Sequence, residues 1–219
     1  MTPSKLDLPS LLNRHHIRPK KSLGQNFLWD PNILSRIVNA AELPQGAQVL
    51  EIGPGVGTLT RHLAEAAAFV RTVEIDRTLK PALDEVLAPY PNVELVLGDI
   101  LKVPPQDVMP AGGYYVIANI PFYITSALIR HLLETPKKPA RMVLTIQHEV
   151  AKRVCEQPGN LSLLALSVQV YGLPSLAFKI PAGAFYPVPD VDSAVLRIDL
   201  YDQPRIPVEQ LELFFRLAK

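Results

Sequence analysis

Short apolar runs alternate along this chain with segments whose apolar residues recur at helical spacing, and this alternation constrains the fold more than any other feature. The apolar runs lie near 48–52, 69–74, 93–97, 114–118 and 141–147, and the helical patterns lie near 57–67, 78–87, 124–134 and 160–171. Strands that alternate with helices predict an α/β fold with a doubly wound, mainly parallel sheet. Two later runs, 176–180 and 194–200, are expected to complete a seven-stranded sheet, and 30–42 is expected to be a helix that begins at Asp30-Pro31.

The first strand runs into a glycine-rich turn, Val49-Leu50-Glu51-Ile52-Gly53-Pro54-Gly55-Val56-Gly57. Glycine accepts positive φ and lets a ligand approach the backbone closely, so Gly53 and Gly55 are predicted to bind a nucleotide-like cofactor. A dinucleotide site requires the spacing G-x-G-x-x-G, but the residue three after Gly55 is Thr58, and the spacing here is G-x-G-x-G. Together with the acidic Glu51, this pattern favours S-adenosylmethionine over NAD as the cofactor.

Acidic residues follow the next two predicted strands. Glu74 lies 21 residues after Gly53, and an acid about 20 residues beyond such a turn is where nucleotide cofactors present their ribose hydroxyls. Asp99, in Gly98-Asp99, is positioned to accept a hydrogen bond from the adenine amine of the cofactor. A single acid of this kind is more commonly an ordinary loop residue. Their recurrence at the ends of successive strands indicates a cofactor site.

The tetrapeptide Asn119-Ile120-Pro121-Phe122 follows the predicted strand 114–118 and would face a ligand in the crevice outside the strand ends. An aryl amine such as adenine N6 is a weak nucleophile, because its lone pair is delocalised into the ring. The side-chain oxygen of Asn119 and a backbone carbonyl near Ile120 can each accept one N–H, which favours a pyramidal nitrogen. The Phe122 ring can stack on the base, at about 1–3 kcal/mol per base. The plainer interpretation is a strand-to-loop turn, where Asn and Pro are common.

Several ordered segments together resemble one family, the ribosomal RNA adenine N6-dimethyltransferases, and most closely the bacterial small-subunit type. The resemblance extends from about Arg18 to the last residue. The matching segments are Lys21-Ser22-Leu23-Gly24-Gln25-Asn26-Phe27-Leu28, Glu51 to Gly55, Glu74-Ile75-Asp76-Arg77, Gly98-Asp99, Asn119 to Ser126, Gln147 to Arg153 and Phe185 to Val195. Their order and spacing make the resemblance more specific than a general methyltransferase match.

This resemblance implies a Rossmann-like class I methyltransferase that uses S-adenosylmethionine. It implies cofactor contacts at Asn26, Leu28, Gly53, Glu74, Asp99 and Asn119, and a role for Asn119, Pro121 and Phe122 in handling the target adenine. Many members carry Tyr at the position of Phe122, so the ring face is retained here but a phenol hydroxyl is absent. The implied reaction dimethylates N6 of two adjacent adenosines in a loop near the 3′ end of small-subunit rRNA, during ribosome biogenesis.

The implied division of the chain has three parts. Residues 1–29 form a basic arm and a cofactor-contacting segment, 30–202 form the methyltransferase domain, and 203–219 begin a small helical C-terminal domain. The helical pattern from Val208 to Lys219 has neither a Gly cap nor a Pro stop, so the chain is expected to be a shortened form.

The net charge of +1 is small for a protein that binds RNA, but the charge is unevenly distributed. Residues 1–21 contain one acid, Asp7, two histidines and five basic residues: Lys5, Arg14, Arg18, Lys20 and Lys21. Such an arm could lie along RNA phosphates, although a solvated tail is the commoner fate of a basic terminus. Further candidates for RNA contact are Lys137, Lys138, Arg141, Lys152 and Arg153.

Composition narrows the class of protein. The single cysteine, Cys155, excludes an internal disulfide, and the absence of a signal-like segment or a long apolar run predicts a cytoplasmic protein. The five histidines have no metal-ligand spacing, so no metal is expected. The resemblance implies that the small-subunit precursor is the partner, and the protein is expected to be a monomer.

Three alternatives remain open from the sequence. A large-subunit rRNA methyltransferase of the macrolide-resistance type shares the core motifs, but Val191-Asp192-Ser193-Ala194 favours the small-subunit type. A ribosome-assembly or transcription-factor-like binding module would keep the fold without catalysis, which the intact site residues disfavour. A DNA adenine methyltransferase uses a similar tetrapeptide but would lack Gln25-Asn26-Phe27-Leu28.

Overall fold

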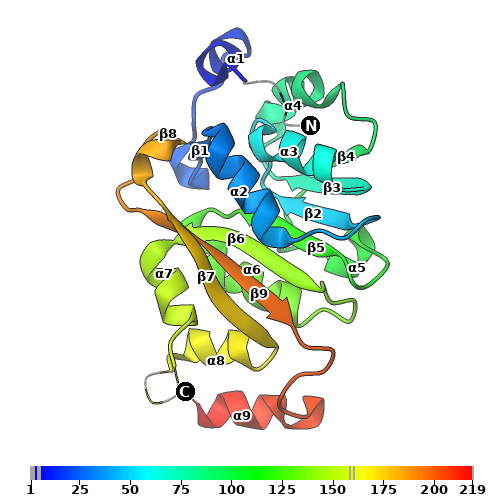
Figure 1. The fold of residues 1–219 in the computed structure, drawn as a ribbon, viewed down its shortest axis with the longest axis vertical. Coiled ribbons are helices and arrows are strands. Elements are labelled where there is room, and N and C mark those ends of the chain that lie inside the picture. The colour runs from blue at the N-terminus through cyan, green and yellow to red at the C-terminus, as the bar shows by residue number, and fades with distance from the viewer. Residues whose placement is uncertain (1–2, 4–5, 158, 160, 219) are drawn as a thin grey trace.

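A seven-stranded sheet forms the centre of the molecule in the computed structural model, which describes residues 3, 6–157, 159 and 161–218 (Figure 1). The strand order is β4-β3-β2-β5-β6-β9-β7. The strands are β2 (Gln48–Ile52), β3 (Phe69–Glu74), β4 (Val93–Leu97), β5 (Tyr115–Asn119), β6 (Arg141–Gln147), β7 (Gly172–Ile180) and β9 (Ser193–Leu200). The first five pair in parallel, whereas β9 is antiparallel to both β6 and β7. The predicted mainly parallel α/β sheet is confirmed.

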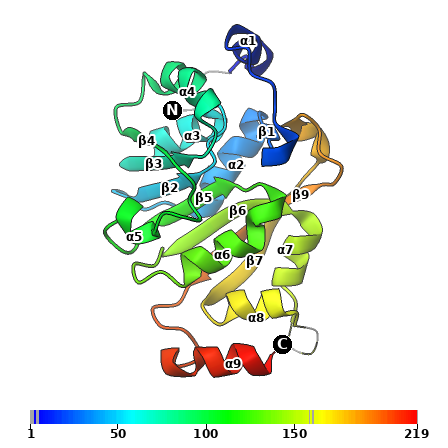
Figure 2. The ribbon, with the colours of Figure 1, turned by 180° about the vertical axis from the view of Figure 1, so that it is seen from behind.

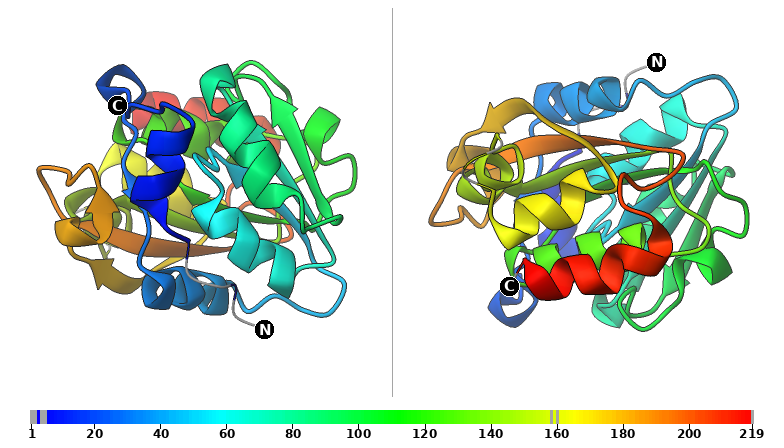
Figure 3. Two further views of the ribbon diagram at one scale, coloured as in Figure 1. Left: turned by 90° about the horizontal axis from the view of Figure 1, so that it is seen from above. Right: turned by 90° about the horizontal axis from the view of Figure 1, so that it is seen from below.

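Helices cover both faces of this sheet. Helices α2 (Pro31–Ala41) and α3 (Thr58–Ala66) cover the face seen in Figure 1, and α5 (Pro105–Val108) and α6 (Thr125–Leu133) cover the face seen in Figure 2. The remaining helices are α1 (Leu8–Arg14), α4 (Lys80–Leu87), α7 (His148–Val154), α8 (Leu163–Gln169) and α9 (Leu211–Leu217). Short 3₁₀ turns are η1 (Lys21–Leu23), η2 (Arg77–Leu79), η3 (Phe122–Ile124), η4 (Ala182–Ala184) and η5 (Val208–Gln210). Helix α9 lies beside α8 at the end of the molecule shown in Figure 3.

Local sequence explains where the helices begin. Asp30 caps α2, since its side chain accepts hydrogen bonds from the backbone N–H groups of Asn32 (2.8 Å) and Ile33 (3.1 Å), and Pro31 occupies the first turn. Ser162 caps α8 in the same way, through the N–H of Ala165. These caps satisfy donors that have no partner within the helix.

The element boundaries differ from the predicted ones by a few residues. The strand expected at 114–118 runs from Tyr115 to Asn119, so Asn119 is the last strand residue and its backbone is held by pairing with Thr145. The strand expected at 176–180 begins earlier, at Gly172, and the helix expected at 160–171 is shorter. Asn160, Lys219 and Lys5 lie outside the described residues.

Two short elements were not expected. Strands β1 (Phe27–Leu28) and β8 (Phe185–Tyr186) form a separate two-stranded antiparallel sheet. The partners are more than 150 residues apart in the chain, and two residues carry no readable period, so local sequence does not reveal such a pair.

The basic arm is also more structured than the sequence indicated. Helix α1 buries Leu8, Leu11 and Leu12 in an apolar cluster with α4. These residues therefore fold against the domain, and contact between the arm and RNA phosphates stays a prediction. The predicted division of the chain at 29/30 and 202/203 stays a prediction.

Candidate functional site

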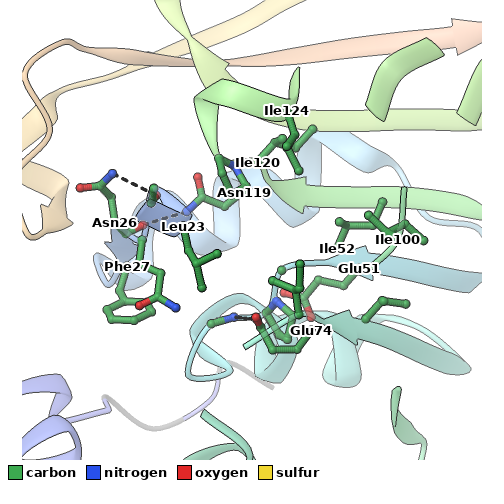
Figure 4. Close-up of a pocket in the computed structure, with 18 of the residues that line it drawn as sticks. Leu23, Asn26, Phe27, Glu51, Ile52, Glu74, Ile100, Asn119, Ile120 and Ile124 are labelled. Carbon is green, nitrogen blue, oxygen red and sulfur yellow. Dashed lines mark hydrogen bonds between the residues drawn. The ribbon is translucent and has the colours of Figure 1, made fainter. Parts of the chain in front are cut away.

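A pocket of about 200 Å³ lies at the carboxyl ends of the parallel strands (Figure 4). Its walls come from the glycine-rich turn after β2, the ends of β3 and β5, the turn after β4, and the segment 23–28. Every residue predicted to bind the cofactor or the target base lines this one pocket: Asn26, Leu28, Gly53, Gly55, Glu74, Asp99, Asn119, Pro121 and Phe122. The fold brings the residues together because parallel strands present their carboxyl ends at the same edge.

The three glycines of the turn serve different purposes, although all have positive φ. Gly53 (φ +68°) has open space where a side chain would begin, with only the Asn119 carbonyl oxygen at 4.0 Å, so a ligand can approach its backbone. A Cβ at Gly55 would lie 2.9 Å from the Phe27 ring, and one at Gly57 would lie 3.0 Å from Val86. The absence of a side chain therefore lets a ligand approach the backbone at Gly53. At Gly55 and Gly57 it allows tight packing against Phe27 and Val86.

Glu74 ends β3 inside the pocket and is almost fully buried. Its carboxylate accepts hydrogen bonds from the backbone N–H groups of Gly55 (3.2 Å) and Asp76 (2.7 Å). Burial raises the pKa of Glu74 above its ordinary value, and these hydrogen bonds oppose that rise. The carboxylate thus links the glycine turn to the end of the next strand, and its position suits an acceptor for ribose hydroxyls.

Glu51 is a second acid in the pocket, and the sequence did not single it out as a site residue. Only 1% of it is exposed, and its Oε2 has no hydrogen-bond partner among the described residues. Thr60 of α3 and Thr72 of β3 flank the carboxyl, but their hydroxyls lack hydrogen bonds of good geometry. Burial is the main cause that raises the pKa of Glu51 to about 8, so the group is largely protonated at neutral pH.

The side chain of Asn119 is oriented by a residue far away in the sequence. Its Nδ2 donates to the backbone carbonyl of Asn26 at 3.1 Å, and Nδ2 of Asn26 donates to the carbonyl of Gly24 at 3.2 Å (Figure 4). The bond to a carbonyl identifies the amide nitrogen and leaves Oδ1 as the free acceptor. No described residue donates to this oxygen, so it is available to an incoming amine.

The remaining predicted residues surround this amide. Ile120 is anchored by its N–H, which donates to the Thr145 carbonyl at 3.1 Å, and Phe122 is half-buried at the start of η3. Leu28 is buried in β1. Asp99 uses Oδ1 to accept from the N–H of Leu101 at 3.1 Å. Its other oxygen lies 3.6 Å from the exposed Nζ of Lys102, so this carboxylate is only partly satisfied inside the protein.

A polar clamp fastens the segment before the pocket to the end of β3. Lys20 Nζ and Gln25 Nε2 donate to the two oxygens of Asp76 at 2.7 and 2.8 Å, and the N–H of Lys20 donates to Gln25 Oε1 at 2.8 Å. Burial alone would raise the pKa of Asp76, but the hydrogen bonds from Lys20, Thr78 and Gln25 outweigh it and lower the pKa to about 2. The sequence feature that could have indicated this clamp is the acid two residues after Glu74.

Comparison with known proteins agrees with this geometry. The sequence model of the family described as ribosomal RNA adenine dimethylase matches residues 16–219. The chain belongs to this family. Curated relatives named ribosomal RNA small subunit methyltransferase A include one from Alkaliphilus oremlandii, 41% identical over 95% of this chain and 75% of that protein. One from Streptococcus agalactiae is 43% identical over 96% of this chain and 75% of that protein.

Solved structures place this member of the adenine dimethylase family among class I S-adenosylmethionine-dependent methyltransferases. The 23S rRNA methyltransferase ErmE aligns with a TM-score of 0.77 at 34% identity, over 88% of this chain and 77% of that one. A dimethyladenosine transferase from Plasmodium falciparum aligns with a TM-score of 0.71 at 30% identity, over 79% and 62% of the two chains. The predicted fold class and family are confirmed, and an RNA adenine methyltransferase is favoured over a DNA methyltransferase.

Several basic residues considered for RNA contact are occupied within the protein. Arg14 pairs with Glu85 at 2.5 Å, Lys20 belongs to the clamp, and Arg141 pairs with Asp199 and Glu42. Arg18 and Lys21 are exposed and make no ion pair with a described residue. RNA contact stays a prediction for these two residues.

The described residues contain neither a metal-ligand cluster nor a membrane-spanning helix. They contain no group of three or more His, Cys, Asp or Glu side chains arranged to hold a metal ion. None of the helices in residues 3, 6–157, 159 and 161–218 has the length and apolar character needed to cross a membrane.

Proposed function

We propose that this protein transfers methyl groups to N6 of adenosines in small-subunit rRNA, dimethylating two adjacent adenosines in a loop near the 3′ end. The observation that carries the proposal is the oriented amide of Asn119, whose free Oδ1 lies in the same pocket as the glycine turn and Glu74. We further infer that the protein acts in the cytoplasm as a monomer, without a metal ion, on a precursor of the small subunit.

The pocket fits S-adenosylmethionine. Gly53 leaves room for close approach to the backbone, Glu74 offers carboxylate oxygens to ribose hydroxyls, and Asp99 has an oxygen for an adenine amine. Asn26, Leu28 and Gly55 complete the wall around this position. When bound, S-adenosylmethionine supplies an electrophilic methyl group on a positively charged sulfur.

The residues of the tetrapeptide prepare the target amine. Oδ1 of Asn119 accepts one N–H of adenine N6, and the backbone carbonyl near Ile120 accepts the other, so the nitrogen lone pair is directed away from the ring. Phe122 stacks on the base, and Pro121 holds the turn in which both residues lie. The nitrogen becomes cationic on alkylation and then acidic, so its proton can pass to water without a strong base.

The shape of the site also restricts the substrate. An adenine inside a duplex cannot present N6 to Asn119, so the target must be unpaired or turned out of a helix. For a second transfer, the nitrogen retains only one N–H, and the pocket must accommodate the first methyl group.

Labelled S-adenosylmethionine, incubated with unmethylated small subunits, large subunits and DNA in parallel, tests the proposal. We expect label only in small-subunit rRNA, and mass spectrometry should identify N6-dimethyladenosine at adjacent positions. Label confined to large subunits would instead support the macrolide-resistance type of activity. Cofactor binding without any labelled nucleic acid would support a binding role.

A further inference from the structure

Two exposed tyrosines lie in segments that form the pocket wall, and the proposed chemistry does not use either of them. Tyr123 is 62% exposed and lines the pocket, and Tyr186 is 50% exposed and directly follows Phe185, which also lines it. Single exposed apolar residues need no explanation, but two exposed aromatic rings on the segments of one pocket wall suit planar ligands. Val188, which is 64% exposed, extends the apolar surface beyond Tyr186.

The ring of Tyr123 lies close to Gly24, which belongs to the segment that forms the pocket wall. A Cβ at Gly24 would lie 3.6 Å from Cδ1 and Cε1 of this ring and 3.3 Å from Cβ of Pro121. Gly24 has φ +60°, so the absence of a side chain there allows both the turn and the close contact. The ring therefore has a fixed support while most of its surface faces solvent.

Tyr186 is positioned by the small two-stranded sheet. It pairs with Phe27 of β1, and Phe185 beside it is buried. Successive side chains of a strand point to opposite faces, so burial of Phe185 directs Tyr186 outward. The segment 24–27 thus positions both tyrosines. Gly24 lies close to the Tyr123 ring, and Phe27 pairs with Tyr186.

Exposed positive charge lies in the chain segment that leads to this pocket wall. Arg18 and Lys21 are exposed, and Lys21 opens the 3₁₀ turn that leads directly to Gly24. No described acid pairs with either side chain, in contrast to Arg14 and Lys20. Exposed rings together with exposed cations are the combination that binds single-stranded nucleic acid, because every base has a stacking face and every linkage carries a negative charge.

We propose that Tyr123 and Tyr186 stack on the unpaired nucleotides that flank the target adenosine, while Arg18 and Lys21 contact the adjoining phosphates. This inference rests on the proposed function and adds a second site to it. The pocket receives the reacting base, and the two tyrosines hold its neighbours. Stacking of about 1–3 kcal/mol per base corresponds to roughly 5- to 140-fold in affinity for each ring.

Substitutions at the two tyrosines test this site against unmethylated small subunits. Tyr123→Ala and Tyr186→Ala should each lower kcat/KM for the subunit within that range, mainly through KM, and should leave the Kd for S-adenosylmethionine unchanged. Tyr123→Phe and Tyr186→Phe should retain most of the activity, because stacking needs the ring and not the hydroxyl. Leu173→Ala is the matched control, since Leu173 is 57% exposed in β7, near the opposite end of the sheet.

Ultraviolet crosslinking of the subunit to the unaltered protein provides a readout that does not depend on catalysis. We expect crosslinked nucleotides on peptides that contain Tyr123 and Tyr186, and none on the peptide that contains Leu173. Crosslinks at these tyrosines without methyl transfer would support the proposed stacking by Tyr123 and Tyr186 and refute the proposed enzyme activity. Normal methylation by both alanine variants, or crosslinks only at other residues, would refute the proposed stacking. Neither result would contradict the proposed enzyme activity.

Discussion

The acids at the amino end of the parallel sheet differ from those inside the pocket at its carboxyl end. At the amino end, Arg141 and Arg197 both bind Asp199 and Glu42, with Arg197 Nη1 2.8 Å from Glu42 and Nε 2.9 Å from Asp199. The hydrogen bond from Arg197 is the main cause that lowers the pKa of Glu42. At the carboxyl end, Glu51 and Glu74 are buried without a cation, and burial raises the pKa of both.

The difference concerns the pocket and not the whole carboxyl end, because Asp76, which does not line the pocket, pairs with Lys20. Acids paired with arginines have satisfied oxygens and stabilise the junction of α2, β6 and β9. The pocket acids Glu51 and Glu74 cost stability when they are ionised, because a buried carboxylate lacks the solvation of water. Glu74, which accepts hydrogen bonds from Gly55 and Asp76, keeps lone pairs that the ribose hydroxyls of a cofactor can use.

The largest expected effect comes from Asn119→Ala at the carboxyl end. Loss of the oriented oxygen should lower kcat by roughly 100- to 1,000-fold, the usual cost of removing one preorganised polar group at a reacting centre. Methyl transfer to small subunits measures the loss, and thermal unfolding should show that the fold survives. Asn39→Ala, at an exposed amide on α2, is the control and should retain activity. Full activity of Asn119→Ala would refute its assigned role.

Glu51→Gln should stabilise the cofactor-free protein at high pH. Between pH 4.5 and about 8 the folded protein keeps a proton that the unfolded chain has released, so wild-type stability should fall as pH rises through this range. The amide mimics the protonated acid, and its advantage at pH 9 over pH 5 should be on the order of a few kcal/mol. Urea unfolding at both pH values measures it, and an equal effect of the substitution at both would show that Glu51 is ionised in the folded protein.

Asp76→Asn should loosen the clamp that fastens residues 20–25 to the sheet. Loss of hydrogen bonds to a charged acceptor costs about 1.5–3 kcal/mol, and cofactor affinity should weaken because the pocket wall begins in this segment. The wild-type contribution is present above pH 3.8 and is lost as pH falls through about 2. Calorimetric titration with S-adenosylmethionine measures the affinity. Asp84→Asn, at an exposed ion pair with Lys80, is the control, and equal affinities for both variants would argue against the clamp.

Arg141→Gln, at the amino end, should have the smallest effect on function. Its guanidinium donates to the carbonyl of Ala41 at 2.6 Å and pairs with Asp199, so its loss should destabilise the protein by about 1 kcal/mol. Methyl transfer per folded molecule should remain at the wild-type level, because this end is remote from the pocket. A selective loss of activity in a stably folded variant would contradict the separation of the two ends.

Sequence reasoning succeeded where the relevant signal is local. The alternation of strands and helices, the Asp30-Pro31 start of α2, the glycine spacing and the Asn119 tetrapeptide each lie within a short window. The parallel sheet then aligns the carboxyl ends of its strands. This alignment explains why the predicted residues from Asn26 to Phe122 line one pocket.

The fold class and the residues of the pocket can be predicted from the sequence alone, because periodicity and turn chemistry act over a few residues. Which acids are compensated depends on the folded structure, since Asp76 contacts Lys20 and Gln25 whereas Glu51 lies beside neutral threonines. The folded structure also decided the orientation of the Asn119 amide, through a carbonyl 93 residues away, and the pairing of β1 with β8. Hydrogen bonding and desolvation depend on neighbours in space, and the order of residues does not specify those neighbours until the chain has folded.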